Sequence, residues 1–451
     1  VQITEINVSA TNKGTTKNEM VYLSGRSFNV EETERYAGTN GDPARMASYF
    51  AGVMPSGDTR NDIIIRGNSP LGVLWRLEGV DIPNPNHFAA AGTNGGPICI
   101  LNNNQLSNSD FITSAFPASY GNALSGVFDL KMRNGNNQKR ENTIQFGTNG
   151  LEAGIEGYFS KSSKASYMIN YRYAFLELFD KIGIDLGIPT IPKYQDISFK
   201  LSFPSKKGMV SLWGLGGKSS MEMFSDKNEM STIRNINTFF GSKMGATGLS
   251  HSVSFNPTSY IKTSLAVTGS NSYMRADSVL SASSPYTIYG SDFSEVRAII
   301  TSTYHLKVNP KLRITSGITY THEFVDLIDT AKNENTFLTV TNINDNFGFL
   351  QSHAQGEYAI NNKLKFNAGL HMQYLMFNEK FSVEPRAAIK YEVSPKLNFR
   401  IAYGLHSQKQ QNIVYFFRSL TDTLNLAYKE TNKNLDFTKS HHLALGTGWY
   451  L

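Results

Sequence analysis

The chain has 451 residues, a formal net charge of +6 and a single cysteine, Cys99. This length exceeds one compact core and allows two or three soluble domains. The positive charge is spread along the chain without a basic block that interleaves with aromatic residues, which argues against a nucleic-acid-binding surface. A lone cysteine excludes an internal disulfide, and its apolar context, "GGPICIL", predicts a buried thiol.

Composition narrows the class without deciding it. Charged residues make up 18% of the chain and aromatic residues 12%, while mean hydropathy is negative. No stretch reaches the roughly 18 apolar residues of a membrane helix. This combination is typical of a transmembrane β-barrel, and it also fits a large secreted β-protein.

The first 139 residues combine short apolar runs with many glycine and asparagine residues. Helical stretches are predicted over 31–36 and 43–50, with Asp42 as the N-cap and Pro43 at the first helical position. Short strands are predicted over 62–66, 73–77, 110–113 and 127–132. Together these elements predict a small α+β domain of about 110 residues.

After residue 139 the sequence alternates between apolar and polar residues. In "SYMINYRY" (166–173), Tyr167, Ile169 and Tyr171 share one face, and "KLNFRIAYGLH" (396–406) alternates in the same way. This period predicts strands with one apolar and one polar face. We count about 14 such runs, most of about 9 to 14 residues. A tilted strand needs about 9 to 11 residues to span a bilayer.

The connections between these runs alternate between short and long. Short ones are predicted at 160–164, 204–208, 256–259, 309–311, 361–363 and 394–396. Long ones are predicted at 174–192, 220–240, 272–290, 327–345 and 408–438, with short exceptions near 148–150 and 378–382. This asymmetry is typical of an outer-membrane barrel. Soluble β-sandwiches, the alternative, give no reason for every second connection to be long.

Four spaced motifs of the first part resemble the plug domain of TonB-dependent outer-membrane receptors. They are "IRG" at 65–67, "EGVDIP" at 78–83, "PASYG" at 117–121 and "SGVFDL" at 125–130. Departures from the family pattern are modest: Glu78 replaces an Asp, Ala115 a Gly, and Phe128 with Asp129 an Ile-Asn pair. The sequences of these motifs are most similar to those of receptors of the Bacteroidetes type. The barrel resembles the family only by its pattern.

The resemblance implies a mostly β fold: a transmembrane antiparallel β-barrel with a small α+β plug in its lumen. We expect 22 strands in the complete barrel and about 14 in this sequence. The expected division is a linker over 1–20, the plug over 21–138 and the barrel over 139–451. The last run, "HHLALGTGWYL", has no closing partner, so we expect the barrel to be incomplete at its C-terminal end.

The resemblance also implies a function and its partners. It implies TonB-dependent active transport of a nutrient across the outer membrane of a Gram-negative bacterium, with the plug gating the barrel. The partners are TonB with its inner-membrane energising complex, outer-membrane lipid and, in some relatives, a surface lipoprotein lid. A plugged barrel that serves as a surface-binding or assembly component is the alternative. Siderophore, vitamin, glycan and peptide remain open as cargo.

Enzyme motifs are not found in the sequence. It contains no Gly-x-Ser-x-Gly, His-Glu-x-x-His, Walker or Rossmann pattern. We therefore expect no enzymatic activity, no catalytic residue, no cofactor, no metal site and no nucleic-acid partner.

Three sets of residues are candidates for function. The N-terminal "VQITEINVSA" is either a TonB-binding segment that adds as a strand to its partner or a plain linker. Its candidate residues are Ile3, Thr4, Glu5, Ile6, Asn7 and Val8. Charges inside the apolar plug unit form either a latch that gives way on activation or static pairs. These charges are Arg66, Arg76, Glu78 and Asp81. The loop containing Asn84, Asn86, His87 and Phe88 either faces substrate or is an ordinary turn.

Five basic residues lie on the predicted polar faces of the barrel strands. They are His305, Arg313, Lys365, His371 and Arg400. They favour an anionic cargo, but they are equally needed to pair with acidic residues of the plug.

Overall fold

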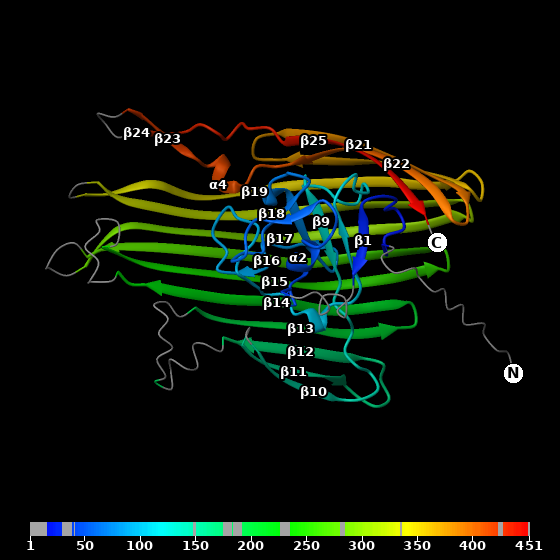
Figure 1. Cartoon of the computed structure of the whole chain (residues 1–451), viewed down its shortest axis with the longest axis horizontal. Helices are drawn as coiled ribbons and strands as arrows, with labels where there is room; N and C mark the ends of the chain where they lie inside the picture. The colour runs from blue at the N-terminus through cyan, green and yellow to red at the C-terminus, as the bar shows by residue number, and fades with distance from the viewer. Residues whose placement is uncertain are drawn as a thin grey trace.

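A computed structural model describes residues 16–28, 38–39, 41–147, 150–174, 183, 192–225, 235–279, 285–333, 336–422 and 427–449. It has two parts: a sheet of long strands and a region of short elements lying against that sheet (Figure 1). We call the 14-stranded sheet the wall and the region formed by β1 to β9 the plug. Among the described residues, no helix has the length and apolar character needed to cross a membrane.

A five-stranded sheet forms the centre of the plug, in the order β1-β8-β9-β4-β5. Its strands are β1 (Gly25–Phe28), β4 (Val73–Leu77), β5 (Val80–Asp81), β8 (Ser109–Ile112) and β9 (Gly126–Leu130). β4 and β9 run parallel, and the other neighbours are antiparallel. The smaller elements are β2 (Val53–Pro55), β3 (Ile63–Ile65), η1 (Pro70–Gly72), β6 (Asn86–His87), β7 (Ile98–Cys99) and η2 (Asn103–Gln105). All four predicted plug strands are confirmed, with ends shifted by at most two residues.

The short helix α2 (Pro43–Ala47) begins as predicted. The Asp42 carboxylate accepts hydrogen bonds from the backbone amides of Ala44 and Arg45, which caps the first turn. The helix ends three residues earlier than the predicted range. The stretch predicted to be helical over 31–36 lies outside the described residues.

Two of the family-like motifs are tight turns. Arg66-Gly67 and Glu78-Gly79 each have positive φ at both residues: 51° and 80° in the first, 54° and 89° in the second. Two central residues with positive φ are what a type I′ hairpin turn requires, and glycine adopts such angles without strain. Arg66 therefore lies in the tight turn that follows β3, and Glu78 lies at the tip of the β4–β5 hairpin.

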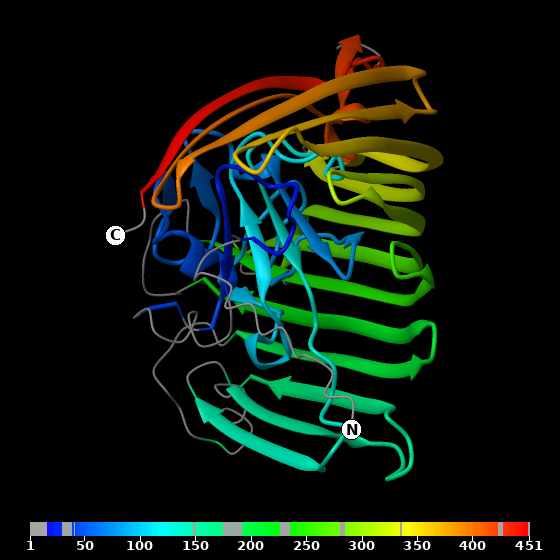
Figure 2. The ribbon, with the colours of Figure 1, turned by 90° about the vertical axis from the view of Figure 1, so that its right-hand side faces the viewer.

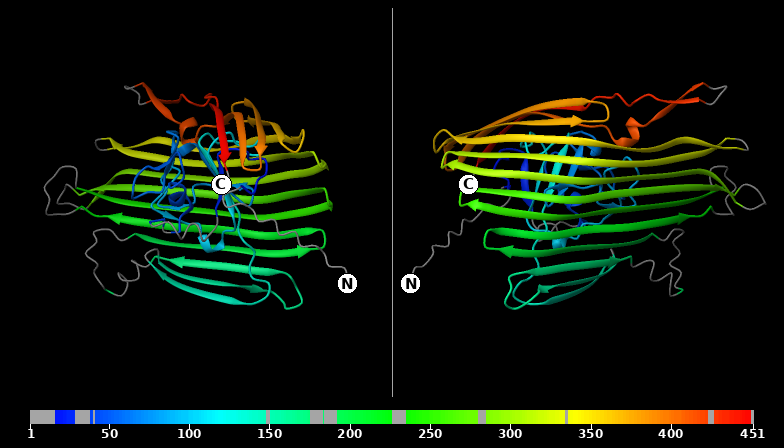
Figure 3. Two further views of the ribbon diagram at one scale, coloured as in Figure 1. Left: turned by 45° about the vertical axis from the view of Figure 1, so that its right-hand side comes forward. Right: turned by 180° about the vertical axis from the view of Figure 1, so that it is seen from behind.

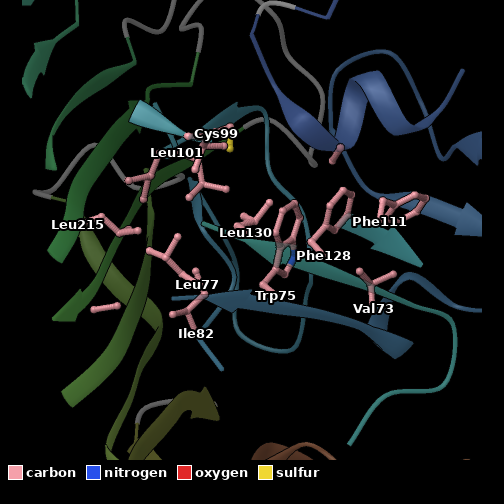
Figure 4. Close-up of a cluster of buried hydrophobic side chains, with 14 of the residues drawn as sticks. Val73, Trp75, Leu77, Ile82, Cys99, Leu101, Phe111, Phe128, Leu130 and Leu215 are labelled. Atoms are coloured by element: carbon pink, nitrogen blue, oxygen red, sulfur yellow. The ribbon is translucent and has the colours of Figure 1, made fainter. Parts of the chain in front are cut away.

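The plug has an ordinary apolar core. The ring of Phe128 is stacked between Trp75 and Phe111, with centroid distances of 4.3 Å and 4.4 Å (Figure 4). The buried cluster continues to Leu215 on the wall, so plug and wall share one core. Cys99 is buried in this cluster, as predicted, and burial raises the pKa of its thiol.

The wall is one antiparallel sheet of 14 strands, the number expected from the sequence. In order they are β10 (Glu141–Gly147), β11 (Gly150–Tyr158), β12 (Ser166–Tyr173), β13 (Lys193–Ser205), β14 (Gly208–Met223), β15 (Ile236–Asn256), β16 (Ser259–Ser278), β17 (Tyr286–Asn309), β18 (Leu312–Asn333), β19 (Thr336–Ala359), β20 (Leu364–Leu375), β21 (Lys380–Ser394), β22 (Leu397–Gln408) and β25 (Thr438–Trp449). The sheet bends around the plug, from β10 at the bottom to β25 at the top (Figure 2). Views from other sides show the plug within this curve (Figure 3).

Burial on the wall reverses the soluble pattern. Leu249, Leu265 and Ile300 are direct cross-strand partners, and each is 46% to 53% exposed. The next position on β16, Ser264, is only 2% exposed. Apolar side chains therefore form the outer face and polar side chains the inner face, which is the pattern of a barrel that stands in lipid.

The predicted long connections over 174–192 and 408–438 agree with the strand ends to within one residue, whereas those over 220–240, 272–290 and 327–345 are too long. β17, β18 and β19 contain 24, 22 and 24 residues, so most of the predicted loop over 327–345 is strand, with only 334–335 between β18 and β19. In this stretch the inner face becomes apolar, because Val325, Leu327 and Ile343 are buried there. Backbone pairing therefore continues where the pattern of apolar-outside, polar-inside residues has ended. The connection over 408–438 includes α4 (Asn412–Tyr415), β23 (Arg418–Asp422) and β24 (Ala427–Glu430).

Candidate functional site

The tip of the β4–β5 hairpin contacts the wall through Glu78. Its Oε1 accepts hydrogen bonds from Lys200 Nζ at 3.0 Å and from the Met132 amide at 2.8 Å. Lys262 Nζ lies 3.7 Å from Oε2 and donates to the Glu78 carbonyl oxygen at 2.8 Å. Burial disfavours the carboxylate, but the two ammonium groups outweigh it and hold the pKa of Glu78 below its usual value. A charged hydrogen-bonded group therefore joins the plug to β13 and β16.

The other three predicted latch residues stay within the plug. Arg76 and Asp81 are cross-strand partners and pair at 2.7 Å, and Arg76 also donates to the Ser119 carbonyl at 2.8 Å. Arg66 has an exposed side chain that donates to Ser24 Oγ at 3.0 Å. Arg76 and Asp81 thus pair with each other, whereas Glu78 contacts basic groups of the wall.

A second contact holds the segment 116–120 of the plug by its backbone. Arg386 Nη1 donates to the carbonyls of Pro117 and Tyr120, each at 2.5 Å, and Arg386 Nη2 pairs with Glu384. The Ala118 amide donates to Gln355 Oε1 at 2.6 Å, and the Ala118 carbonyl lies 2.8 Å from His371 Nδ1. Three neighbouring wall strands, β19 to β21, thus hold one plug loop.

Sequence reasoning identified only His371 among these wall residues. Glu384 and Arg386 are charged residues two apart in a strand whose other face is apolar, which places both on the inner face. That spacing was a usable signal. The contact to backbone carbonyls could not be read from the sequence, because any residue type supplies a carbonyl.

The predicted substrate-facing loop divides into two halves. Asn84 and Asn86 line a cavity. His87 and Phe88 are buried against the wall and contribute nothing to that lining: His87 Nε2 lies 2.9 Å from Asp196, and the Phe88 amide donates to Ser219 Oγ. Burial lowers the pKa of His87 despite the nearby carboxylate.

The cavity next to Asn84 measures about 180 Å³ and lies between the plug, the wall and the segment 408–413. Amide side chains are the most frequent polar groups of its lining, among them Asn84, Asn94, Asn122, Asn271, Gln411 and Asn412. Three of its four charged lining residues are paired: Lys409 with Glu323 at 3.0 Å, and Arg297 with Glu295 at 2.8 Å. The cavity thus offers hydrogen-bond donors and acceptors, with much of its charge compensated.

Residues 16–22, which we call the strap, are fastened on two sides. On the plug, the amides of Lys17 and Asn18 both donate to the Asp110 carboxylate at 2.9 Å. On the wall, Tyr22 donates to Glu357 at 2.7 Å, and Arg400 donates to the Tyr22 carbonyl at 3.0 Å. The first five strap residues were assigned to a linker from the sequence. The predicted TonB-binding residues 3–8 lie outside the described residues.

Comparison with known proteins gives structural relatives only. No protein-family model matches the chain, and no curated protein matches its sequence. Its structure is similar to a mutant of the ferric enterobactin receptor PfeA of Pseudomonas aeruginosa, at 12% identity and a TM-score of 0.67, over 95% of this chain and 69% of that one. It is also similar to the siderophore receptor PirA of Acinetobacter baumannii, at 13% identity and a TM-score of 0.67, over 95% and 68% of the two chains.

A third solved structure is the outer membrane transporter YddB of Escherichia coli, at 11% identity and a TM-score of 0.61, over 86% of this chain and 61% of that one. At these identities the likeness establishes the fold. The chain has the mostly β fold of a plugged outer-membrane barrel, as predicted.

Proposed function

We propose that the protein is a TonB-dependent transporter that carries a nutrient across the outer membrane of a Gram-negative bacterium. The observation that carries this proposal is a plug held by polar, non-covalent contacts inside a wall with an apolar outer face. Hydrogen bonds and ion pairs of this kind can be broken and remade without changing the fold of the wall. The proposal includes the division into a linker over 1–20, a plug over 21–138 and a barrel over 139–451.

Energy enters, on this proposal, through residues 3–8, which add as a strand to TonB. The strap follows this segment, and its attachment to Asp110 joins a pulling force to β8 of the plug sheet. The contacts of Glu78 with Lys200 and of Arg386 with the 116–120 carbonyls then act as the latch between plug and wall. Among the four residues first assigned to the latch, Glu78 is the one that supports this role.

Cargo enters from the opposite end, where the amide-lined cavity lies beside the plug. Its volume is below the roughly 300 Å³ of a typical small-molecule site, so a cargo of ordinary size has to displace the segment 408–413. Many amide groups favour a cargo with several hydrogen-bonding groups. The Bacteroidetes type and a surface lipoprotein lid remain predictions of the sequence resemblance.

A proline test distinguishes TonB dependence from a plain linker. Proline at Ile3 and Ile6 removes backbone donors that a strand needs, whereas valine keeps them. We expect the double change Ile3→Pro/Ile6→Pro in the full-length protein to abolish binding of the purified C-terminal domain of TonB. The matched Ile3→Val/Ile6→Val variant keeps binding. Equal binding by both variants would contradict the proposed TonB segment.

A competition experiment separates transport from the surface-binding alternative. Strains carrying the wild-type or the proline variant are grown together on media that differ in the single limiting nutrient. If the protein is a transporter, the wild-type strain outgrows the proline-variant strain on at least one medium. This growth difference disappears when TonB is deleted from both strains. If the protein only binds at the cell surface, the two strains grow equally well on every medium, with and without TonB.

A further inference from the structure

A second cavity lies at the end of the molecule where the wall strands are joined by short turns. It measures about 550 Å³ and is bounded by the strap, by plug strands β4 and β9, and by wall strands β16 to β19. Its wall side includes the turn residues Pro257 and Thr258. This volume falls within the range of roughly 300 to 1,000 Å³ found for small-molecule sites.

The lining of this cavity is strongly basic. Six basic side chains and two carboxylates give it a formal charge of +4 when its two histidines are neutral. The basic residues are Lys17, Arg76, Lys131, Lys262, Lys307 and Arg313. Asp81 and Glu78, just outside the lining, compensate Arg76 and Lys262. Within the described ranges, the ammonium groups of Lys17, Lys131 and Lys307 have no carboxylate partner.

The charges are graded from solvent inward. Lys17 and Lys307 are exposed, while Lys131 is half-buried. His353 also belongs to the lining, and its Nε2 atom is buried without a hydrogen-bond partner among the groups that the structure describes. A concave surface with charges of one sign concentrates the field and attracts ions of the opposite sign. An anion entering here meets the exposed ammonium groups of Lys17 and Lys307 first and that of Lys131 further in.

Glu19 of the strap already places a carboxylate at this site. It pairs with Arg313, although its own side chain is 66% exposed. Water competes for so exposed a pair, so a ligand that offers several anionic oxygens can displace it by contacting more than one cation at once. Asp129, the other acidic residue of the lining, accepts a hydrogen bond from the Tyr120 hydroxyl at 2.8 Å.

We propose that this cavity binds a small soluble polyanion, with carboxylate or phosphate oxygens, that enters from the short-turn end. Glu19 acts as an internal competitor that the ligand replaces on Arg313. The site depends on the cavity and its charge alone, and it does not require that the protein transports a nutrient.

The test measures binding to the purified full-length protein by isothermal titration calorimetry, at constant ionic strength set with chloride. Citrate and inorganic phosphate are the two probes. Tighter binding of citrate identifies an organic polycarboxylate as the ligand class, and tighter binding of phosphate identifies a phosphate. Failure of both probes to bind saturably would overturn the proposal.

Three variants locate the binding. The double change Lys131→Gln/Lys307→Gln removes two unpaired cations and is expected to weaken binding about tenfold. Glu19→Gln removes the competitor and is expected to strengthen binding, a gain that a misfolded protein cannot give. Lys363→Gln removes an exposed cation from a neighbouring short turn outside the cavity and should leave binding unchanged. Equal weakening by Lys363→Gln, or no gain from Glu19→Gln, would contradict the site. A negative TonB-binding result leaves these outcomes unaffected.

Discussion

Plug and wall bury their side chains by opposite rules. In the plug, Trp75 and Phe128 are 3% and 0% exposed, as in the core of any soluble domain. In the wall, Leu265 is 53% exposed while Gln373 and Glu384 are fully buried. The difference follows from what surrounds each part: the plug packs its apolar groups inward away from water, and the wall turns them toward lipid. A substitution of the same kind should therefore change the stability of the plug and of the wall by different amounts.

The largest effect is expected at the stacked core of the plug. Trp75→Ala removes a buried ring between β4 and its neighbours, and such truncations cost about 3 to 5 kcal/mol of unfolding free energy. Cys99, the single cysteine of the chain, reports on this because it is buried in the same cluster. We expect labelling of Cys99 by a thiol reagent to become much faster in this variant.

The matched control is Ile300→Ala on the outer face of the wall, where the side chain is 47% exposed. It leaves no cavity against the plug, so labelling of Cys99 should stay at the wild-type rate. Heat-modifiable migration on gels should be kept by both variants, because Trp75 lies in the plug sheet and takes no part in the backbone pairing of the wall. Loss of the heat-dependent shift in Trp75→Ala would show that plug and wall fold as one unit.

A charge on the outer face gives the next effect. Leu265 lies in the apolar row with Leu249 and Ile300, and arginine near the middle of a bilayer costs about 2 to 4 kcal/mol in a barrel. Met54→Arg is the plug control, since Met54 is 61% exposed and such surface changes stay within about 0.5 kcal/mol. Urea titration of folding into lipid vesicles measures both. A neutral Leu265→Arg would mean that this face meets water.

The Glu78 contact is expected to contribute less, in a pH-dependent way. Glu78→Gln removes the charge that Lys200 and Lys262 hold, at a cost of about 1 to 3 kcal/mol at neutral pH. The pKa of Glu78 is lowered in the folded protein. The stabilisation that the Glu78 charge provides is therefore complete above the unfolded-state pKa of about 4.3. It is lost as the pH falls from there through the folded-state pKa.

Dithiodipyridine labelling of Cys99, which works in acid, tests this linkage at pH 7 and pH 3. The difference between wild type and Glu78→Gln should be large at pH 7 and should shrink at pH 3. Lys200→Met does not serve as a control, because it leaves the Glu78 carboxylate buried with the more distant Lys262 ammonium group, at 3.7 Å, as its partner. A difference that is constant with pH would assign the effect of Glu78→Gln to packing.

Local rules of the sequence predicted what depends on local physics. The N-cap at Asp42, the plug strands and the short wall turns follow from backbone preferences over a few residues. The long-connection ends of β14 to β19 differ from the prediction, because pairing, as in β18 and β19, continues where the apolar-outside pattern has stopped. The contact of Arg386 with the 116–120 carbonyls depends on sheet register and curvature, which join residues about 270 positions apart. No pattern within one segment contains that information.

The smallest effect compares two turns of the same geometry. Arg66 and Glu78 both have φ near 50° and precede a glycine with positive φ. Asparagine accepts this conformation better than either residue. Arg66→Asn removes an exposed side chain that donates a hydrogen bond to Ser24, so the unfolding free energy should change by less than about 0.5 kcal/mol. Glu78→Asn makes the same backbone change but breaks the contact with Lys200, and it should be clearly destabilising. Urea midpoints of Cys99 labelling compare the two variants. Equal midpoints would show that the turn geometry, and not the contact with the wall, sets the importance of Glu78.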